Sequence, residues 1–335
     1  MQNILHASFD KGNMGRFLYP VDTDQFADIR KDGKVYVDKT DMVFDLVSKY
    51  RYVFLARPRR FGKSLLCNTF KAYFLGQKEL FEGLKIMDLE KEWKKHPVLH
   101  FTMSGLKNLT VPEAKTKLES LIRGYENAYG RDPLSISPGD RFRDLIHHAF
   151  EQTGEKVVVI LDEYDSAIMR LMYEPEQLEA MRTMLREFYQ VLKDEGAYLR
   201  FVFITGVTKF SQLSIFSELN NLKQISMLDE YSGLCGITQE ELDTTLRPCV
   251  GEYAQNLNIT TEEAYALLKK NYDGYHFSAN SKDVYAPFSV LRAFDGCNTN
   301  HYWFESGTMT SLIEHLRHFP IIDAIACDGV EVGED

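Results

Sequence analysis

The chain reads Arg57-Pro58-Arg59-Arg60-Phe61-Gly62-Lys63-Ser64 between a short apolar run, Tyr52–Ala56, and a helical pattern that begins at Ser64. An apolar strand, a tight loop carrying Gly-Lys-Ser and then a helix form the context that a phosphate-binding P-loop requires. The loop and the helix N-terminus favour an anion, because their N–H groups lack partners and the helix dipole is positive there. Lys63 is expected to reach the β- and γ-phosphates of a nucleotide, and Ser64 is expected to ligate Mg²⁺.

The loop departs from the usual pattern at its first position, where Arg57 stands in place of glycine. Gly-Lys-Ser alone also arises often by chance, so the loop needs support from the rest of the chain. The arginines leave two interpretations open: they contact phosphate oxygens or a DNA backbone, or they belong to a solvated or ion-paired loop. The residues predicted to bind the nucleotide are Arg57, Pro58, Arg59, Arg60, Phe61, Gly62, Lys63, Ser64 and Leu65.

A second motif supports the loop about a hundred residues later. Val157–Leu161 is a continuous apolar run, typical of a strand buried on both faces of a parallel sheet, and Asp162-Glu163 follow it. Phosphoryl transfer to water needs a metal ion that neutralises the phosphates and a group that orients or deprotonates the attacking water. We predict that Asp162 holds Mg²⁺ through a water molecule and that Glu163 is the catalytic base. The alternative is a solvated turn after a buried strand, with Tyr164-Asp165 ordering the chain beyond it.

A third element is Thr205, which with Gly206 follows the apolar run Arg200–Ile204. In NTPases with an extra strand between the P-loop strand and the acidic strand, a polar residue here contacts the attacking water or the γ-phosphate. Thr205 therefore joins Lys63 and Glu163 as a predicted catalytic residue, although threonine at a strand end is also common without a function.

The alternation of strand-like and helical segments predicts an α/β fold, a doubly wound and mainly parallel sheet with a smaller, mostly helical C-terminal region. Strands are expected near residues 35–37 and 98–103, and helical segments near 90–95 and 307–317. Capping boxes at 110–113, 238–241 and 260–263 mark helix starts. The predicted division is an N-terminal extension (1–18), an ATPase core (19–233) and a helical lid (234–335). Residues 36–40 either line the nucleotide pocket or belong to a structural extension.

Composition excludes several classes of protein. The 335 residues carry a formal net charge of −10, which argues against a wholly basic nucleic-acid binder. Apolar runs reach about five residues, against the roughly 18 that cross a bilayer, and no secretory signal is recognisable. These features predict a cytoplasmic protein without a membrane segment. The five cysteines stand far apart, so their spacing indicates neither a zinc site nor a disulfide framework.

In combination, these motifs resemble the AAA-ATPase-like family of predicted bacterial and archaeal P-loop ATPases. The resemblance covers residues from about 17 to 310. It rests on residues 36–40, 57–66, 161–165, 203–207, 215–222, 235–238 and 272–275. The family commonly has arginine at the first loop position, so Arg57 conforms to it. The resemblance implies an ATPase related to AAA and signal-transduction NTPases, often carrying a C-terminal PD-(D/E)xK nuclease-like domain. The sequence leaves no room for that domain, so it is expected to be a fragment or to lack the module.

The predicted function is that of an ATPase that hydrolyses ATP with Mg²⁺ to shift its C-terminal region, with coupling to nucleic-acid processing implied only by the family. ATP or ADP is the expected ligand, and nucleic acid and a second copy of the chain are open as partners. The alternative is a nucleotide-dependent switch that binds ATP or ADP with little turnover.

Overall fold

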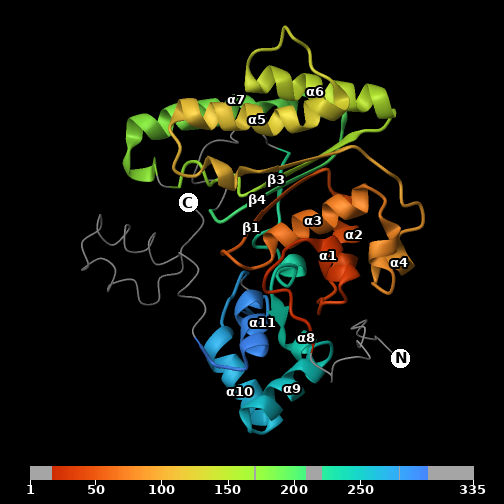
Figure 1. Ribbon diagram of the computed structural model, residues 1–335, viewed down its shortest axis with the longest axis vertical. Helices are drawn as coiled ribbons and strands as arrows, with labels where there is room; N and C mark the ends of the chain where they lie inside the picture. The colour runs from red at the N-terminus through yellow and green to blue at the C-terminus, as the bar shows by residue number, and fades with distance from the viewer. Residues whose placement is uncertain (1–16, 170, 209–220, 279, 301–335) are drawn as a thin grey trace.

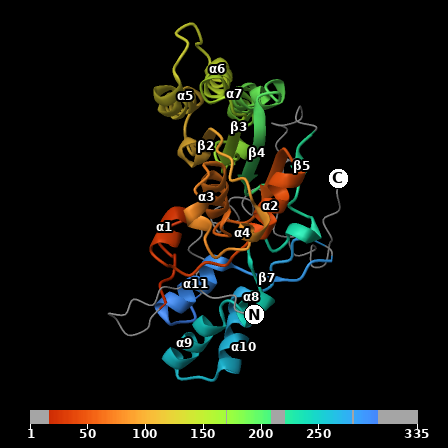
Figure 2. The same cartoon turned by 90° about the vertical axis from the view of Figure 1, so that its right-hand side faces the viewer.

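The computed structural model describes residues 17–169, 171–208, 221–278 and 280–300. Over these ranges, a parallel sheet lies between two layers of helices (Figure 1). A smaller unit, called the C-terminal unit below, comprises the described residues from 237 to 300. It lies at the end of the molecule opposite the helices α5–α7, as Figures 1 and 2 both show. The predicted α/β architecture with a parallel sheet is confirmed.

The main sheet has the strand order β2-β3-β4-β1-β5, and every neighbouring pair is parallel. The strand that leads into the P-loop is therefore paired with β4, and β4 separates it from the acidic strand β3. All carboxyl ends lie at one edge, which is where ligands collect in open α/β sheets. The strands are β1 (Tyr52–Ala56), β2 (Val98–Thr102), β3 (Val157–Asp162), β4 (Leu199–Gly206) and β5 (Lys223–Gln224).

Each face of the sheet is buried by its own set of helices. Side chains alternate along a strand, so Leu161 of β3 packs toward one layer while Ile160 packs toward the other. One layer consists of α1 (Phe26–Lys31), α2 (Thr40–Lys49), α3 (Lys63–Phe74) and α4 (Ile86–Leu89). The other consists of α5 (Val111–Tyr129), α6 (Pro138–Thr153) and α7 (Pro175–Asp194).

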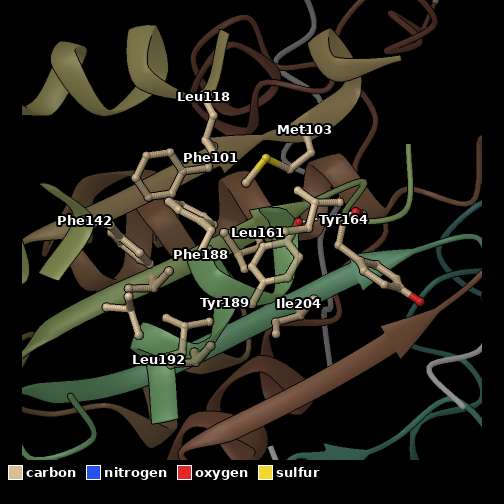
Figure 3. Packing of buried hydrophobic residues seen from close by; sticks show 14 of the residues in the cluster. Phe101, Met103, Leu118, Phe142, Leu161, Tyr164, Phe188, Tyr189, Leu192 and Ile204 are labelled. Carbon is tan, nitrogen blue, oxygen red and sulfur yellow. Dashed lines mark hydrogen bonds between the residues drawn. The ribbon is translucent and has the colours of Figure 1, made fainter. Parts of the chain in front are cut away.

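Aromatic side chains fill the space between the sheet and α5–α7 (Figure 3). The rings of Phe142 and Phe188 stack with centroids 4.5 Å apart, and Phe101 of β2 meets both rings edge-on. All three are fully buried. Such aromatic packing stabilises the folded state by more than the burial of its apolar area alone, and it holds α6 and α7 on the sheet.

The C-terminal unit has a core of its own. The two short strands β6 (Ile237–Thr238) and β7 (Val284–Tyr285) pair antiparallel. Tyr19 and Val35 belong to the N-terminal lead-in, the described residues 17–51 before β1, and they pack into the core of this unit. The lead-in therefore connects the two parts of the chain. The helices of the unit are α8 (Gln239–Asp243), α9 (Arg247–Leu257), α10 (Thr261–Tyr272) and α11 (Pro287–Gly296).

The three predicted capping boxes are confirmed at the starts of α5, α8 and α10. Two local predictions are wrong. Residues 35–37 form no strand, because Val35 packs into the core of the C-terminal unit and its N–H donates to the carbonyl oxygen of Leu18 outside any strand ladder. Residues 90–95 form no helical turn, since Glu90 accepts from the N–H groups of Glu92 and Trp93 and bends the chain instead. The predicted helix at 307–317 lies outside the described residues. Among the described helices, none has both the length and the apolar character needed to cross a membrane.

Candidate nucleotide-binding site

The loop between β1 and α3 has the backbone that a P-loop requires. Gly62 is the N-cap of α3 with φ 87°, in the left-handed region that glycine adopts without a steric penalty. Lys63 and Ser64 then open the helix. Their side chains thus stand in the first turn, where the N–H groups have no intrahelical acceptor.

Lys63 closes the loop upon itself. Its Nζ donates to the carbonyl oxygens of Arg57 at 2.9 Å and Pro58 at 2.8 Å. The side chain is buried, and burial lowers the pKa of the Lys63 ammonium below its usual value. The carbonyl groups therefore hold the cation at the position from which it could turn to a phosphate.

Ser64 and Asp162 connect the loop to the acidic strand. The Ser64 hydroxyl donates to Asp162 Oδ2 at 2.6 Å, and Asp162 is only 2% exposed. Burial raises the pKa of the Asp162 carboxyl, and the hydrogen bond from Ser64 opposes that rise. Asp162 Oδ1 is buried without a hydrogen-bond partner in the described part of the chain. A hydroxyl and a carboxylate with one unsatisfied oxygen fit a hard divalent cation such as Mg²⁺.

Glu163, the predicted base, lies directly after β3 with an unusual backbone. Its φ is 54°, which a residue other than glycine adopts at a cost of about 1–3 kcal/mol. Its Oε2 accepts a hydrogen bond from the Ser166 hydroxyl at 3.0 Å, and the residue is partly exposed. Strain next to a buried carboxylate at the edge of a sheet is characteristic of functional sites.

Thr205 has a different environment from that of Lys63 and Asp162. Its hydroxyl donates to the carbonyl oxygen of Leu55 at 2.7 Å, and the side chain is fully buried. In this arrangement the Thr205 hydroxyl forms a hydrogen bond between β4 and β1. The structure brings Thr205 to the predicted edge of the sheet, but its hydroxyl makes no contact with the Ser64–Asp162 pair.

Asp165 orders the segment that leaves β4. Its Oδ2 accepts from the N–H groups of Val207 at 2.9 Å and Thr208 at 2.7 Å. A Cβ at Gly206 would lie 2.6 Å from Asp165 Oδ1 and from the ring of Tyr164. Tyr164-Asp165 thus fix the exit of β4 as well as the turn after Glu163, and glycine is required at 206.

The Arg57 side chain is only 2% exposed, which is unexpected for a charged residue in a loop. Nη1 donates to the carbonyl oxygens of Ala56 at 3.0 Å and Ser226 at 2.7 Å, and Nη2 donates to that of Tyr231 at 3.2 Å. The guanidinium carbon lies 4.0 Å from the centre of the Phe277 ring. Burial lowers the pKa of Arg57 to about 10. Arg57 therefore joins the loop to residues 226–231 and to the C-terminal unit.

The remaining loop residues divide between the surface and the C-terminal unit. Arg59 and Arg60 are exposed, and the guanidinium carbon of Arg60 lies 4.2 Å from the centre of the Phe288 ring. Phe61 is buried with its ring centroid 4.7 Å from that of Tyr275. Pro58 and Leu65 are partly buried. Sequence patterns had not indicated the aromatic contacts, because their partners stand more than two hundred residues away.

An apolar pocket that is open to solvent lies beside the loop. Three segments line it. Tyr36 and Val37 come from the lead-in, Gly62 and Leu65 from the loop and α3, and Pro287 is one of the residues from the C-terminal unit. The pocket thus begins where the loop between β1 and α3 ends.

Comparison with known proteins agrees with this geometry. Residues 20–216 match the family described as "Predicted AAA-ATPase". The chain is also 37% identical over 304 residues to a protein of Azotobacter chroococcum mcd 1 described as "Uncharacterized protein in vnfD 5'region". That alignment covers 90% of this chain and 57% of the relative, so the chain spans little more than half of the relative's length. Since the family match extends over more than half of the residues and includes both the loop and the acidic strand, this chain belongs to the family of predicted AAA-ATPases.

Proposed function

We propose that this chain binds ATP with Mg²⁺ at residues 57–65 and hydrolyses it. The observation that carries the proposal is the hydrogen bond from Ser64 to Asp162, which unites the first turn of α3 with the end of the acidic strand. Lys63 stands beside this pair, and within the described part of the chain its buried ammonium group donates to two carbonyl oxygens. Phosphates are stronger acceptors than carbonyls, so Lys63 would exchange its loop contacts for the β- and γ-phosphates.

Ser64 and Asp162 would hold the metal ion, since both side chains offer oxygen and Asp162 Oδ1 has no partner among the described residues. Bound Mg²⁺ supplies charge neutralisation for the phosphates. Glu163 would accept a proton from the attacking water. Thr205 remains a predicted contact of that water or of the γ-phosphate. Donation to the γ-phosphate would require its proton to leave the carbonyl oxygen of Leu55.

The apolar pocket is the proposed place of the purine base. It adjoins Gly62 and Leu65, so a nucleotide whose phosphates lie on the loop can extend its base into it. Tyr36 and Val37 of the lead-in would contact the base, as one interpretation of residues 36–40 suggests. Pro287 would contribute from the C-terminal unit, which would then act as a lid.

Binding would be transmitted through the loop. Arg57, Arg60 and Phe61 contact aromatic rings of the C-terminal unit. A ligand that reorders the loop would change these contacts, and the equilibrium would shift toward the arrangement that favours the ligand. Coupling of this movement to nucleic acid, or to a second copy of the chain, is a proposal that rests on the family alone.

The alternative is a nucleotide-dependent switch with little turnover. Two observations favour it: the Thr205 hydroxyl is engaged within the sheet, and the Arg57 guanidinium is engaged by carbonyl groups. Release of inorganic phosphate, measured with purified protein in the presence and absence of DNA, separates the two functions. Turnover supports the ATPase, whereas saturable ATP binding without phosphate release supports the switch.

Lys63→Ala tests the nucleotide site itself. Loss of a buried charged donor to phosphate is expected to weaken ATP binding by about 2–5 kcal/mol, measured by calorimetric titration with ATP and Mg²⁺. Lys78→Ala is the matched control, because Lys78 is an exposed lysine that lies beyond the end of α3. Thermal unfolding of both variants verifies the fold. Unchanged ATP affinity in a folded Lys63→Ala variant contradicts the proposed site.

A further inference from the structure

Three side chains that are distant in sequence converge below the loop: Cys67, His100 and Asp162. The cysteine sulfur, a ring nitrogen of the histidine and a carboxylate oxygen all lie within 4.8 Å of one another. Cys67 is one turn after Ser64 on α3, and Asp162 ends β3. His100 is in β2, opposite Ile160 of β3. The arrangement exists only because β2 and β3 are neighbours beneath α3.

Two polar atoms of this cluster are unsatisfied. Asp162 Oδ1 and His100 Nε2 are both buried, and neither has a hydrogen-bond partner within the described ranges. Asp162 is 2% exposed and Cys67 is fully buried. Buried polar groups without partners are rare in folded proteins, and an unseen ion or water is a common reason for one. A cation bound by these side chains would satisfy both atoms at once.

The donor set indicates which cation. Thiolate, imidazole and carboxylate together favour Zn²⁺, whereas Mg²⁺ prefers oxygen donors alone. Zinc bonds of about 2.0–2.3 Å place tetrahedral ligand atoms roughly 3.3–3.8 Å apart, so shifts on the order of 1 Å would close the cluster around the ion. Three protein ligands leave a fourth position open, as in zinc sites that are not purely structural.

The charges around the cluster are mixed. Besides burial, the carboxylates of Asp162 and Asp24 raise the pKa of the Cys67 thiol, and the Lys63 ammonium lowers it. Besides burial, the Lys71 ammonium lowers the pKa of His100. Burial lowers the pKa of His100 to about 4, so its ring is neutral at neutral pH. Burial raises the pKa of the Cys67 thiol, and the thiol proton would pass to water as the sulfur–metal bond forms.

We propose that Cys67, His100 and Asp162 form a binding site for Zn²⁺ that shares Asp162 with the nucleotide site. One oxygen of Asp162 accepts from Ser64, so Zn²⁺ and the Mg²⁺ of the nucleotide would compete for the other, Oδ1, which has no hydrogen-bond partner within the described residues. Bound Zn²⁺ is thus expected to inhibit ATP turnover at the nucleotide site. This consequence for turnover rests on the proposed function, but binding of the metal does not.

Binding is tested on the full chain with Co²⁺, which reports thiolate ligation by a charge-transfer band in the near ultraviolet, and with Zn²⁺ in competition with a chromophoric chelator. We expect one Co²⁺ per chain, displaced by Zn²⁺. Cys67→Ser is expected to remove the band and to weaken zinc binding at least about tenfold. Cys249→Ser, which changes another fully buried cysteine, is expected to retain both.

His100→Gln tests the site through a second ligand. In this variant the cobalt band is expected to shift, and the zinc affinity is expected to fall at least about tenfold. Thermal unfolding verifies each variant. A wild-type chain without a thiolate–cobalt band, or a band that persists in Cys67→Ser, overturns the site. ATP binding in zinc-free buffer is measured separately, so a failure of the nucleotide site is distinguishable. Where turnover is present, chelator-reversible zinc inhibition that is weaker in Cys67→Ser is the expected result.

Discussion

Glu163→Gln is expected to preserve ATP binding and to lower turnover by about 10²–10⁴-fold. The amide has the shape of the carboxyl group and can still accept from the Ser166 hydroxyl, which donates to Glu163 at 3.0 Å. It cannot accept a proton from water, so only the chemical step should fail. The backbone at 163 should persist, because glutamine meets the same restriction at φ 54° as glutamate does.

The measurement combines phosphate release under saturating ATP with calorimetric ATP titration of the same samples. Glu187→Gln is the matched control: Glu187 is an exposed glutamate on α7, and its replacement should leave both quantities unchanged. Full hydrolysis by Glu163→Gln would exclude Glu163 as the base. Wild-type protein that binds ATP but releases no phosphate would instead favour the switch, and the substitution would then have nothing to remove.

The sheet and its loop were predictable because their signals are local. The apolar run before Arg57, the run before Asp162 and the Thr110–Glu113 capping box each specify an element within a few residues. The hydrogen bond between Ser64 and Asp162 follows from placing two strand ends at one edge. What the sequence could not indicate depends on partners far along the chain.

Residues 35–37 illustrate the limit. Their alternation resembles a strand, but a strand needs a neighbour to pair with, and Val35 instead meets the core of the C-terminal unit. The Cys67–His100–Asp162 cluster is a second case, since cysteine spacing contains no information on which strand lies beside β3. Thr205 is a third. The strand end was recognisable, but the acceptor of its hydroxyl, Leu55, is set by the pairing of β4 with β1.

Arg57 is the clearest case of a residue whose role follows from tertiary contacts, and its replacement should have a large effect on stability. Arg57→Ala is expected to lower the free energy of unfolding by about 3–5 kcal/mol. The guanidinium donates to the carbonyl oxygens of Ser226 and Tyr231, which would remain buried without these donors. The change would also leave a cavity against Phe277, whose ring centre lies 4.0 Å from the guanidinium carbon.

Urea denaturation of the wild type, Arg57→Ala and Arg59→Ala measures this effect. Arg59 is the matched control, because it is an exposed arginine two residues away in the same loop, and its replacement should change the free energy of unfolding by no more than about 0.5 kcal/mol. Two measurements, the free energy of unfolding and the ATP affinity, then distinguish a structural role of the loop arginines from contact with phosphate. A side chain that joins the loop to residues 226–231 and Phe277 produces a loss of stability already in the nucleotide-free protein. A side chain that contacts phosphate produces a loss of ATP affinity at unchanged stability, and that result for Arg57→Ala would mean that the guanidinium leaves its carbonyl partners when the nucleotide binds.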